Sequence, residues 1–165
     1  MRSAALLFCT LMLWLVFASV APAAHAGGPA VDRNEHRVVD AVNWIRGSYR
    51  LPGLKLNRSL SRAADYHSWE MLAANYFAHS SRNGASFSSR VKAFRRSRRV
   101  GETLAMVPRC TRRGARRAVR MWMLSASHRD VLLSRRFRRI GVGMRSGRIG
   151  SGRACMVTAD VASRR

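Results

Sequence analysis

The sequence predicts an α+β domain in which helices pack on a small, mainly antiparallel sheet. Helical patterns come first along the chain, whereas the second half places short apolar strands around a pair of helices. The chain contains no internal repeat and no heptad pattern, which excludes a solenoid and a coiled coil.

The first 26 residues predict a secretory signal peptide. Arg2 precedes an apolar run of 17 residues from Ala4 to Val20, and a small-x-small cleavage motif follows at 24–26. Removal after Ala26 leaves 139 residues, the size of one ordinary domain. An uncleaved membrane anchor is the alternative, because the run reaches the lower limit of a membrane-spanning helix. We expect residues 27–36 to form an N-terminal extension and residues 37–162 to form the domain.

Two helices are predicted before residue 80. The first covers 32–46, where valine and isoleucine recur at helical spacing and Asn34 is expected as the N-cap. The second begins after the N-cap Asn57 and continues to Tyr76 with one apolar stripe. His67 lies on this stripe, so we interpret it as a packing residue rather than a ligand.

The middle of the chain predicts a turn, a short helix and a strand. Asn83-Gly84 is typical of a turn, and Ser86 is expected to cap a helix that reaches Ala93. The basic run 95–99 is too charged for a core. Residues 101–107 are apolar and lie between a glycine and a proline, which favours a strand.

A helix pair and two strands complete the prediction. The first helix of the pair has an amphipathic stripe that includes Trp122, which we interpret as a packing anchor. Ser127 and Asp130 have the spacing of a capping box, which places His128 in the first turn of the second helix. The strands are predicted at 138–144 and 154–161, and the Gly-rich turn 146–152 joins them.

The cysteines predict one disulfide. Cys9 lies in the signal segment, so removal of that segment leaves Cys110 and Cys155. An even pair of cysteines in an exported protein favours a bridge between them. Two buried free thiols are the alternative.

The charge is the most extreme feature of the composition. The chain has 31 lysine and arginine residues against 8 acidic residues, a formal charge of +23. Such a field attracts polyanions, namely nucleic acid, acidic lipids or phosphate-bearing envelope polymers. A GC-rich genome, which drifts lysine codons towards arginine, is the alternative origin of this excess.

Three arginine-rich runs would carry polyanion binding, at 95–99, 112–117 and 135–139. No aromatic stacking platform interrupts them, because Phe94 and Phe137 are single and are expected in the core. Any binding of nucleic acid would therefore be non-specific and driven by phosphate, and we expect it to weaken steeply with added salt.

Several short motifs, in this order and spacing, resemble the CAP superfamily of sperm-coating-protein-like domains. This superfamily includes cysteine-rich secretory proteins, antigen 5 and plant pathogenesis-related proteins. The similarity is greatest to its short bacterial secreted branch, and it runs from Val39 to about Val161. The matching positions are Asn43, Arg46, Leu60, Ala64, Met71, 76–80, 83–84, Arg90, 101–102, Trp122, Ser125, 128–129 and 140–143.

The resemblance implies an α-β-α sandwich with a central cleft that usually gathers two histidines and two acidic residues. His79, Glu102 and His128 match three of these four positions, and Ser125 stands where the second acidic residue usually falls. It therefore implies a ligand-binding cleft formed by these four residues. Two imidazoles and a carboxylate also predict a site for Zn²⁺ or another divalent metal at His79, Glu102 and His128. A hydrogen-bonded cluster that binds nothing is the alternative.

These observations favour a secreted, non-catalytic binding module, extracellular or associated with the cell envelope. Its cleft would take a divalent metal or a small ligand, and its basic surface would bind anionic envelope polymers or lipids. The alternative function is a metal-dependent hydrolase, a peptidase or a nuclease, that uses the same cleft. The serine at position 125 removes the obvious general base, which makes catalysis the weaker hypothesis.

Overall fold

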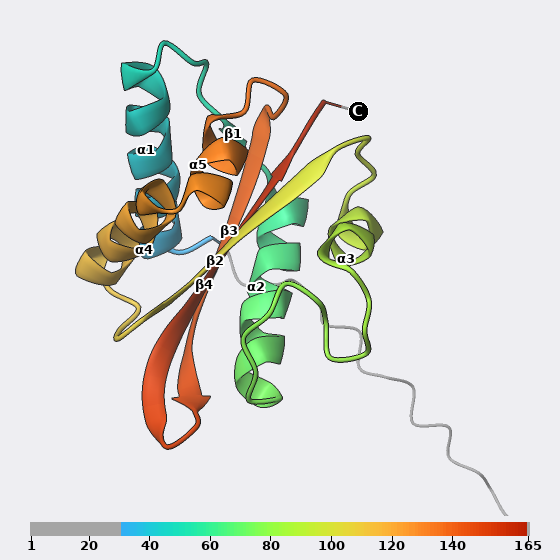
Figure 1. Cartoon of the computed structure of the whole chain (residues 1–165), viewed down its shortest axis with the longest axis vertical. Helices are drawn as coiled ribbons and strands as arrows, with labels where there is room; N and C mark the ends of the chain where they lie inside the picture. The colour runs from blue at the N-terminus through green and yellow to red at the C-terminus, as the bar shows by residue number, and fades with distance from the viewer. Residues whose placement is uncertain (1–30, 165) are drawn as a thin grey trace, which may run out of the picture.

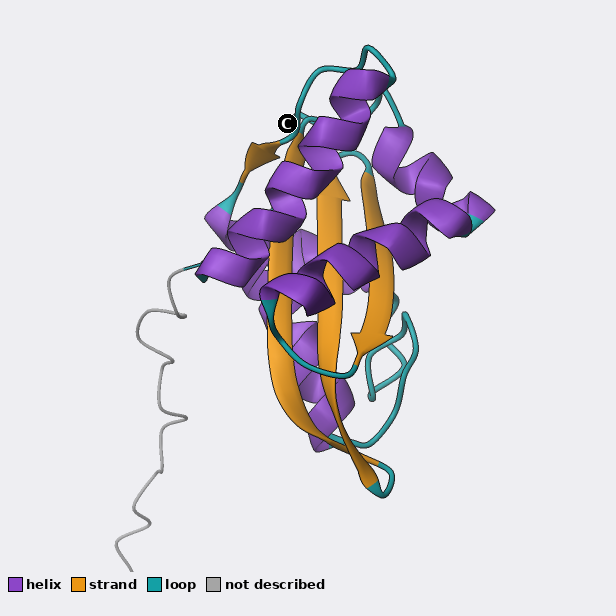
Figure 2. Ribbon diagram, turned by 90° about the vertical axis from the view of Figure 1, so that its left-hand side faces the viewer, coloured by secondary structure: helices purple, strands orange, loops and turns teal. Residues whose placement is uncertain are grey.

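The computed structural model describes residues 31–164 and confirms the α+β class. Helices lie on both faces of a four-stranded mixed sheet (Figures 1 and 2). The predicted signal peptide and its cleavage site lie outside the described residues. The elements are α1 Arg33–Ser48, β1 Lys55–Leu56, α2 Arg58–Ala73, α3 Phe87–Phe94, β2 Val100–Val107, α4 Arg112–Leu124, α5 Ala126–Leu133, β3 Arg139–Ile149 and β4 Gly152–Ala162.

The sheet has the strand order β1-β3-β4-β2, so β2 is an edge strand. β4 pairs antiparallel with β2 and with β3, whereas the two-residue β1 pairs parallel with β3. The sequence did not predict β1, because two residues cannot show a strand period. β3 and β4 extend to Ile149 and Gly152, so the connecting turn is shorter than the predicted 146–152.

The main core lies between the sheet and the pair α1 and α4. On β4, Val157, Ala159 and Val161 face this core, where Trp122 of α4 is fully buried. The Trp122 indole N–H donates to the Leu104 carbonyl at 2.9 Å, which satisfies its only polar atom. Trp122 is therefore confirmed as a packing anchor.

The other face of the sheet packs against α2 at very short range. Glycines make this possible, because a Cβ on Gly141 would lie 2.1 Å from the backbone of Leu60, and one on Gly143 would lie 2.2 Å from the Asp65 nitrogen. The α2 backbone thus rests directly on β3. The Ser68 hydroxyl also lies 2.9 Å from the Thr158 hydroxyl of β4, so this layer carries polar as well as apolar contacts.

The helix caps confirm two predictions and correct one. Asn57 and Ser86 cap α2 and α3 through their side chains, as expected. The N-cap of α1 is Asp32 and not Asn34, because the Asp32 carboxylate accepts from two backbone amides of the first turn. Glu35 completes the capping box by accepting from the Asp32 amide at 2.8 Å.

The start of α5 also differs from the prediction. The helix begins at Ala126 with Ser125 as its N-cap, so the expected capping box between Ser127 and Asp130 does not form. His128 still lies in the first turn, as predicted. The chain turns directly from α4 into α5, which leaves no room for a separate cap at Ser127.

The predicted disulfide between Cys110 and Cys155 is present. It ties the turn before α4 to β4. Phe137 is buried, as expected, but Phe94 is 37% exposed, so its predicted place in the core is wrong. None of the helices within residues 31–164 is long and apolar enough to cross a membrane.

Candidate ligand site

Three of the predicted site residues come together at the edge strand β2. Glu102 lies on β2, His79 lies in the loop between α2 and α3, and His128 lies in the first turn of α5. The His79 Nδ1 is 2.8 Å from a Glu102 oxygen, and the centroids of the two imidazole rings are 6.2 Å apart. The α2–α3 loop and α5 approach from opposite layers of the fold. We call the group formed by His79, His128, Glu102 and Arg90 the imidazole site.

Arg90 of α3 holds Glu102 from the protein interior. Its guanidinium donates to the Glu102 oxygen that does not contact His79, and both side chains are nearly or fully buried. The same guanidinium donates to the His79 carbonyl at 3.1 Å and to the Ser81 hydroxyl at 2.9 Å. Arg90 thus fixes both the carboxylate and the backbone of the loop that carries His79.

These contacts determine the tautomer of His79. A carboxylate can only accept, so the His79 Nδ1–H donates to Glu102, and in the neutral ring Nε2 is then the acceptor nitrogen. The His79 side chain is 49% exposed, whereas that of Glu102 is fully buried. The site therefore presents an accessible imidazole whose orientation is fixed by the buried ion pair of Glu102 and Arg90.

The Glu102 carboxylate, predicted as one of three metal ligands, is engaged within the protein. Both Glu102 oxygens are engaged, one by His79 and the other by Arg90. Within residues 31–164, no group of three or more histidine, cysteine, aspartate or glutamate side chains is placed to hold a metal ion. Glu102 orients His79 through its hydrogen bond to Nδ1, which is also how a carboxylate outside the ligand shell orients a metal-binding histidine.

His128 supplies the second ring of the site. Partial burial, and next the proximity of His79, lower the pKa of His128 below its ordinary value. The ring is therefore neutral at pH 7, with one nitrogen lone pair available to a ligand.

Ser125 is the fourth residue that was predicted for the ligand-binding cleft. It ends α4 and begins α5, and its hydroxyl lies 3.2 Å from the Ser127 hydroxyl. Among the described residues it makes no hydrogen bond to either imidazole or to Glu102.

A buried polar cluster below the site anchors the His79 loop. The His67 ring donates to the Ala78 carbonyl at 2.9 Å and lies 3.1 Å from Glu70. Glu70 also accepts from the Tyr76 hydroxyl at 2.8 Å and from the Arg82 amide at 3.1 Å. His67 is fully buried, which confirms its structural role, and its cluster holds both ends of the segment that carries His79.

Sequence reasoning missed the roles of Arg90 and Asp160. Asp160 lies on β4 directly opposite Glu102 in the β2–β4 register and is fully buried. Neither of its oxygens has a hydrogen-bond partner in this geometry, so the surroundings of Asp160 favour the uncharged carboxyl. Burial, and next the negative charge of Glu102, raise the pKa of Asp160 well above its ordinary value. The sequence contained a signal for Asp160, because it is an acidic residue within an apolar strand. The same signal singled out Glu102.

Asp160 is expected to make stability depend on pH. A raised pKa means that the folded state keeps a proton that the unfolded state loses above about pH 4, so stability falls as pH rises from there towards the folded pKa. We predict that the stability of Asp160→Asn falls less steeply with rising pH. Its free energy of unfolding, relative to that of the wild type, should rise by up to about 1.4 kcal/mol for each pH unit in this range. Urea unfolding across this range measures it.

The exposed Asp130→Asn is the control for this prediction and should follow the wild-type pH dependence. Glu35, whose pKa burial raises to about 7, is common to all three proteins and cancels in the comparison. A stability difference between the wild type and Asp160→Asn that does not change with pH would contradict the prediction.

The α-β-α sandwich and the paired histidines over an edge-strand glutamate define the class of sperm-coating-protein-like domains. The family model of the cysteine-rich secretory protein family, CAP, matches residues 39–158. This chain belongs to that family.

Relatives and solved structures agree with this assignment. An uncharacterized protein of Bacillus subtilis, YkwD, is 33% identical over 115 residues, which cover 69% of this chain and 43% of the relative. An extracellular protein of Bacillus anthracis that contains an SCP domain has a TM-score of 0.66 at 25% identity, covering 79% of this chain and 40% of that one. An outer surface protein of Borrelia burgdorferi has a TM-score of 0.68 at 16% identity, covering 83% and 97%, and shows the fold alone. The chain thus spans less than half the length of the first two.

Proposed function

We propose that this protein is a secreted, non-catalytic binding module whose imidazole site takes a small ligand. Secretion is supported by the N-terminal signal sequence and by the similarity to proteins described as extracellular. The basic exterior would hold the module near anionic polymers or lipids of the cell envelope.

The hydrogen bond between Glu102 and His79, beside the neutral ring of His128, carries this proposal. It fixes one accessible imidazole with its Nε2 as acceptor, next to a second imidazole at 6.2 Å. Two such nitrogens recognise a ligand that donates hydrogen bonds or a cation that accepts lone pairs. A divalent metal held here would have two protein ligands at most, with Glu102 as an outer partner, so we expect weak binding.

The alternative, a metal-dependent hydrolase, has less support. Hydrolysis needs a general base or an activated nucleophile in reach of the substrate. Ser125 occupies the position of the second acidic residue, and Asp160, the carboxyl opposite Glu102 in the strand register, is fully buried. Assays with peptide and nucleic-acid substrates in the presence of zinc test this alternative, and turnover that His79→Ala abolishes would establish it.

Calorimetric titration with zinc chloride tests the imidazole site itself. We expect weak binding to the wild type and its loss in the double variant His79→Ala, His128→Ala. Glu102→Gln should weaken binding by roughly 10- to 100-fold, because the orienting partner of His79 is changed. The exposed His36 lies elsewhere, on α1, so His36→Ala should bind like the wild type. Equal heats for the wild type and the double variant would contradict the proposal.

A further inference from the structure

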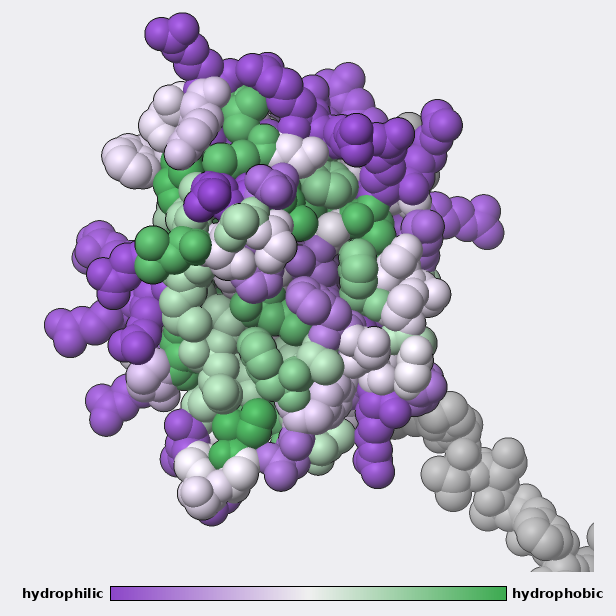
Figure 3. Space-filling model, in the orientation of Figure 1, coloured by the Kyte–Doolittle hydropathy of each residue, from purple (hydrophilic) through white to green (hydrophobic). Residues whose placement is uncertain are grey.

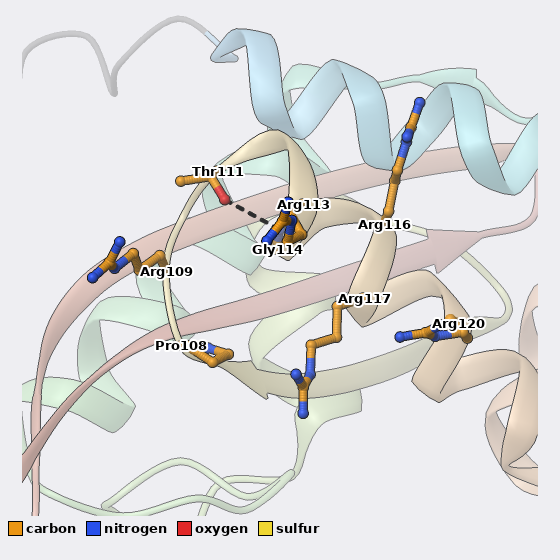
Figure 4. Close-up of a pocket in the computed structure, with 8 residues that line it drawn as sticks. All are labelled: Pro108, Arg109, Thr111, Arg113, Gly114, Arg116, Arg117 and Arg120. Carbon is orange, nitrogen blue, oxygen red and sulfur yellow. Dashed lines mark hydrogen bonds between the residues drawn. The ribbon is translucent and has the colours of Figure 1, made fainter.

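The start of α4 carries an arginine-lined hollow that lies away from the imidazole site. Its volume is about 690 Å³, and no residue of the imidazole site lines it. Figure 4 shows the guanidinium groups spread around the turn and the first turns of the helix. We call this feature the α4 hollow. It is lined by Pro108, Arg109, Thr111, Arg113, Gly114, Arg116, Arg117 and Arg120.

The arginines of the α4 hollow repel one another without compensation. Arg113 and Arg117 are four residues apart on the helix, as are Arg116 and Arg120, and such pairs of like charge destabilise a helix. No carboxylate lines the hollow, and none of the five arginines that line it forms an ion pair within residues 31–164. The charge is thus concentrated where the protein itself provides no counter-charge.

In the turn before α4, the backbone of Arg109 packs directly against the first turn of the helix at Gly114. A Cβ on Gly114 would lie 2.0 Å from the Arg109 carbonyl oxygen, so only glycine allows this approach. The Thr111 hydroxyl accepts from the Gly114 amide at 3.2 Å, and the neighbouring Cys110 is bonded to Cys155. The Asn34 side chain of α1 also donates to the Cys110 carbonyl at 3.3 Å. The wall of the hollow is therefore held in place before any ligand arrives, which lowers the entropic cost of binding.

We propose that the α4 hollow binds a flexible, soluble polymer that carries phosphate groups along its chain. Five guanidinium groups offer planar, bidentate contacts to phosphate oxygens. Their spread around the helix suits successive phosphates of a chain better than one isolated ion. This inference rests on the proposed role of the basic exterior and assigns that role to one place.

The shape and chemistry of the hollow favour a flexible chain over a membrane or a nucleic acid. Its lining has no exposed aromatic or long aliphatic side chain that would enter a bilayer or stack on a base. A concave wall also matches a chain that bends into it better than a flat bilayer. In the orientation of Figure 1, hydrophilic side chains project over the α4 side of the molecule (Figure 3).

The test measures the binding of a short, fluorescently labelled linear polyphosphate by anisotropy at increasing salt. Five phosphate contacts predict a slope of about 3.5 in the logarithm of affinity against the logarithm of salt, which is roughly a 100-fold loss between 50 and 200 mM salt. The triple variant Arg113→Gln, Arg117→Gln, Arg120→Gln should lower this slope by about two and bind at least about tenfold more weakly at low salt.

A matched control separates the α4 hollow from the general charge of the protein. The triple variant Arg58→Gln, Arg62→Gln, Arg153→Gln removes the same charge from exposed positions elsewhere and should keep nearly all of the slope. The hollow variant should also be at least as stable as the wild type at low salt, because it loses like-charge repulsion. Equal weakening by the two triple variants would overturn the proposal.

Two further arms identify the source of the phosphates and separate this proposal from that of the imidazole site. Stronger binding of phosphatidylglycerol vesicles, or of a single-stranded oligonucleotide of matched phosphate number, than of polyphosphate would overturn the assignment to a soluble polymer. The double variant His79→Ala, His128→Ala should bind polyphosphate like the wild type. Its zinc titration reports on the imidazole site alone, so either proposal can fail without the other.

Discussion

Replacing Arg90 with methionine is expected to lower the free energy of unfolding by about 3 to 5 kcal/mol. The substitution leaves the Glu102 carboxylate buried without its cationic partner, while Asp160 lies opposite it on the next strand. It also removes the hydrogen bonds to Ser81 and to the His79 carbonyl. Methionine fills a similar volume, so the loss reports the charge and its hydrogen bonds rather than a cavity.

Arg82→Met is the matched control for this prediction. Arg82 lies in the same connection between α2 and α3, and its side chain is exposed. Its backbone amide contacts Glu70, but this contact does not depend on the side chain. Urea unfolding should place this variant within about 0.5 kcal/mol of the wild type.

A double variant tests whether the cost arises from the orphaned carboxylate. Adding Glu102→Leu to Arg90→Met removes both charges, and part of the lost stability should return, because an apolar pair often replaces a buried ion pair without penalty. A single Arg90→Met that costs no more than Arg82→Met would contradict the structural role given to this pair. So would a double variant that is less stable than Arg90→Met alone.

Removing the bridge between Cys110 and Cys155 is the second large change. The bridge joins residues 45 positions apart, and the chain-entropy model predicts a stabilisation of about 4 kcal/mol for a loop of this length. We expect Cys110→Ala, Cys155→Ala to lose about that amount in urea unfolding, and to lower polyphosphate affinity because Cys110 holds the wall of the α4 hollow.

The reduced wild-type protein is the control for the bridge. It keeps both sulfur atoms, so it separates the cross-link from the void that alanine leaves at the buried Cys155. The reduced protein should lose nearly as much stability as the double variant. Stability of the double variant within about 1 kcal/mol of the oxidised wild type would contradict this account.

The prediction of the fold succeeded where the signal was local. The apolar spacing around Trp122, the caps Asn57 and Ser86, and the order of helices and strands all appear in the structure as predicted. The caps of α1 and α5 were each misplaced by two residues, because several neighbouring side chains could serve as a cap. β1 was missed because pairing with β3, rather than its own two residues, makes it a strand.

For the candidate site, too, the residue types could be predicted from the sequence, whereas the roles that depend on distant contacts could not. His79, Glu102 and His128 stood out as residue types in unusual surroundings, and the structure brings them together. The role of Glu102 could not be predicted, because it depends on Arg90, which reaches the carboxylate from another element. Asp160 was missed because its importance arises from the strand register that places it opposite Glu102.

By itself, the sequence determined the helical and strand periods, the cysteine pair, the excess of arginine, and the choice of His79, Glu102 and His128 as candidate site residues. These properties depend on residue type and on neighbours a few positions apart. Only the tertiary structure decided that Glu102 contacts both His79 and Arg90, that Asp160 is buried opposite it, and that the arginines of α4 surround a hollow. Each of these depends on contacts between distant segments, and the free energy of a charge is set by what surrounds it after folding.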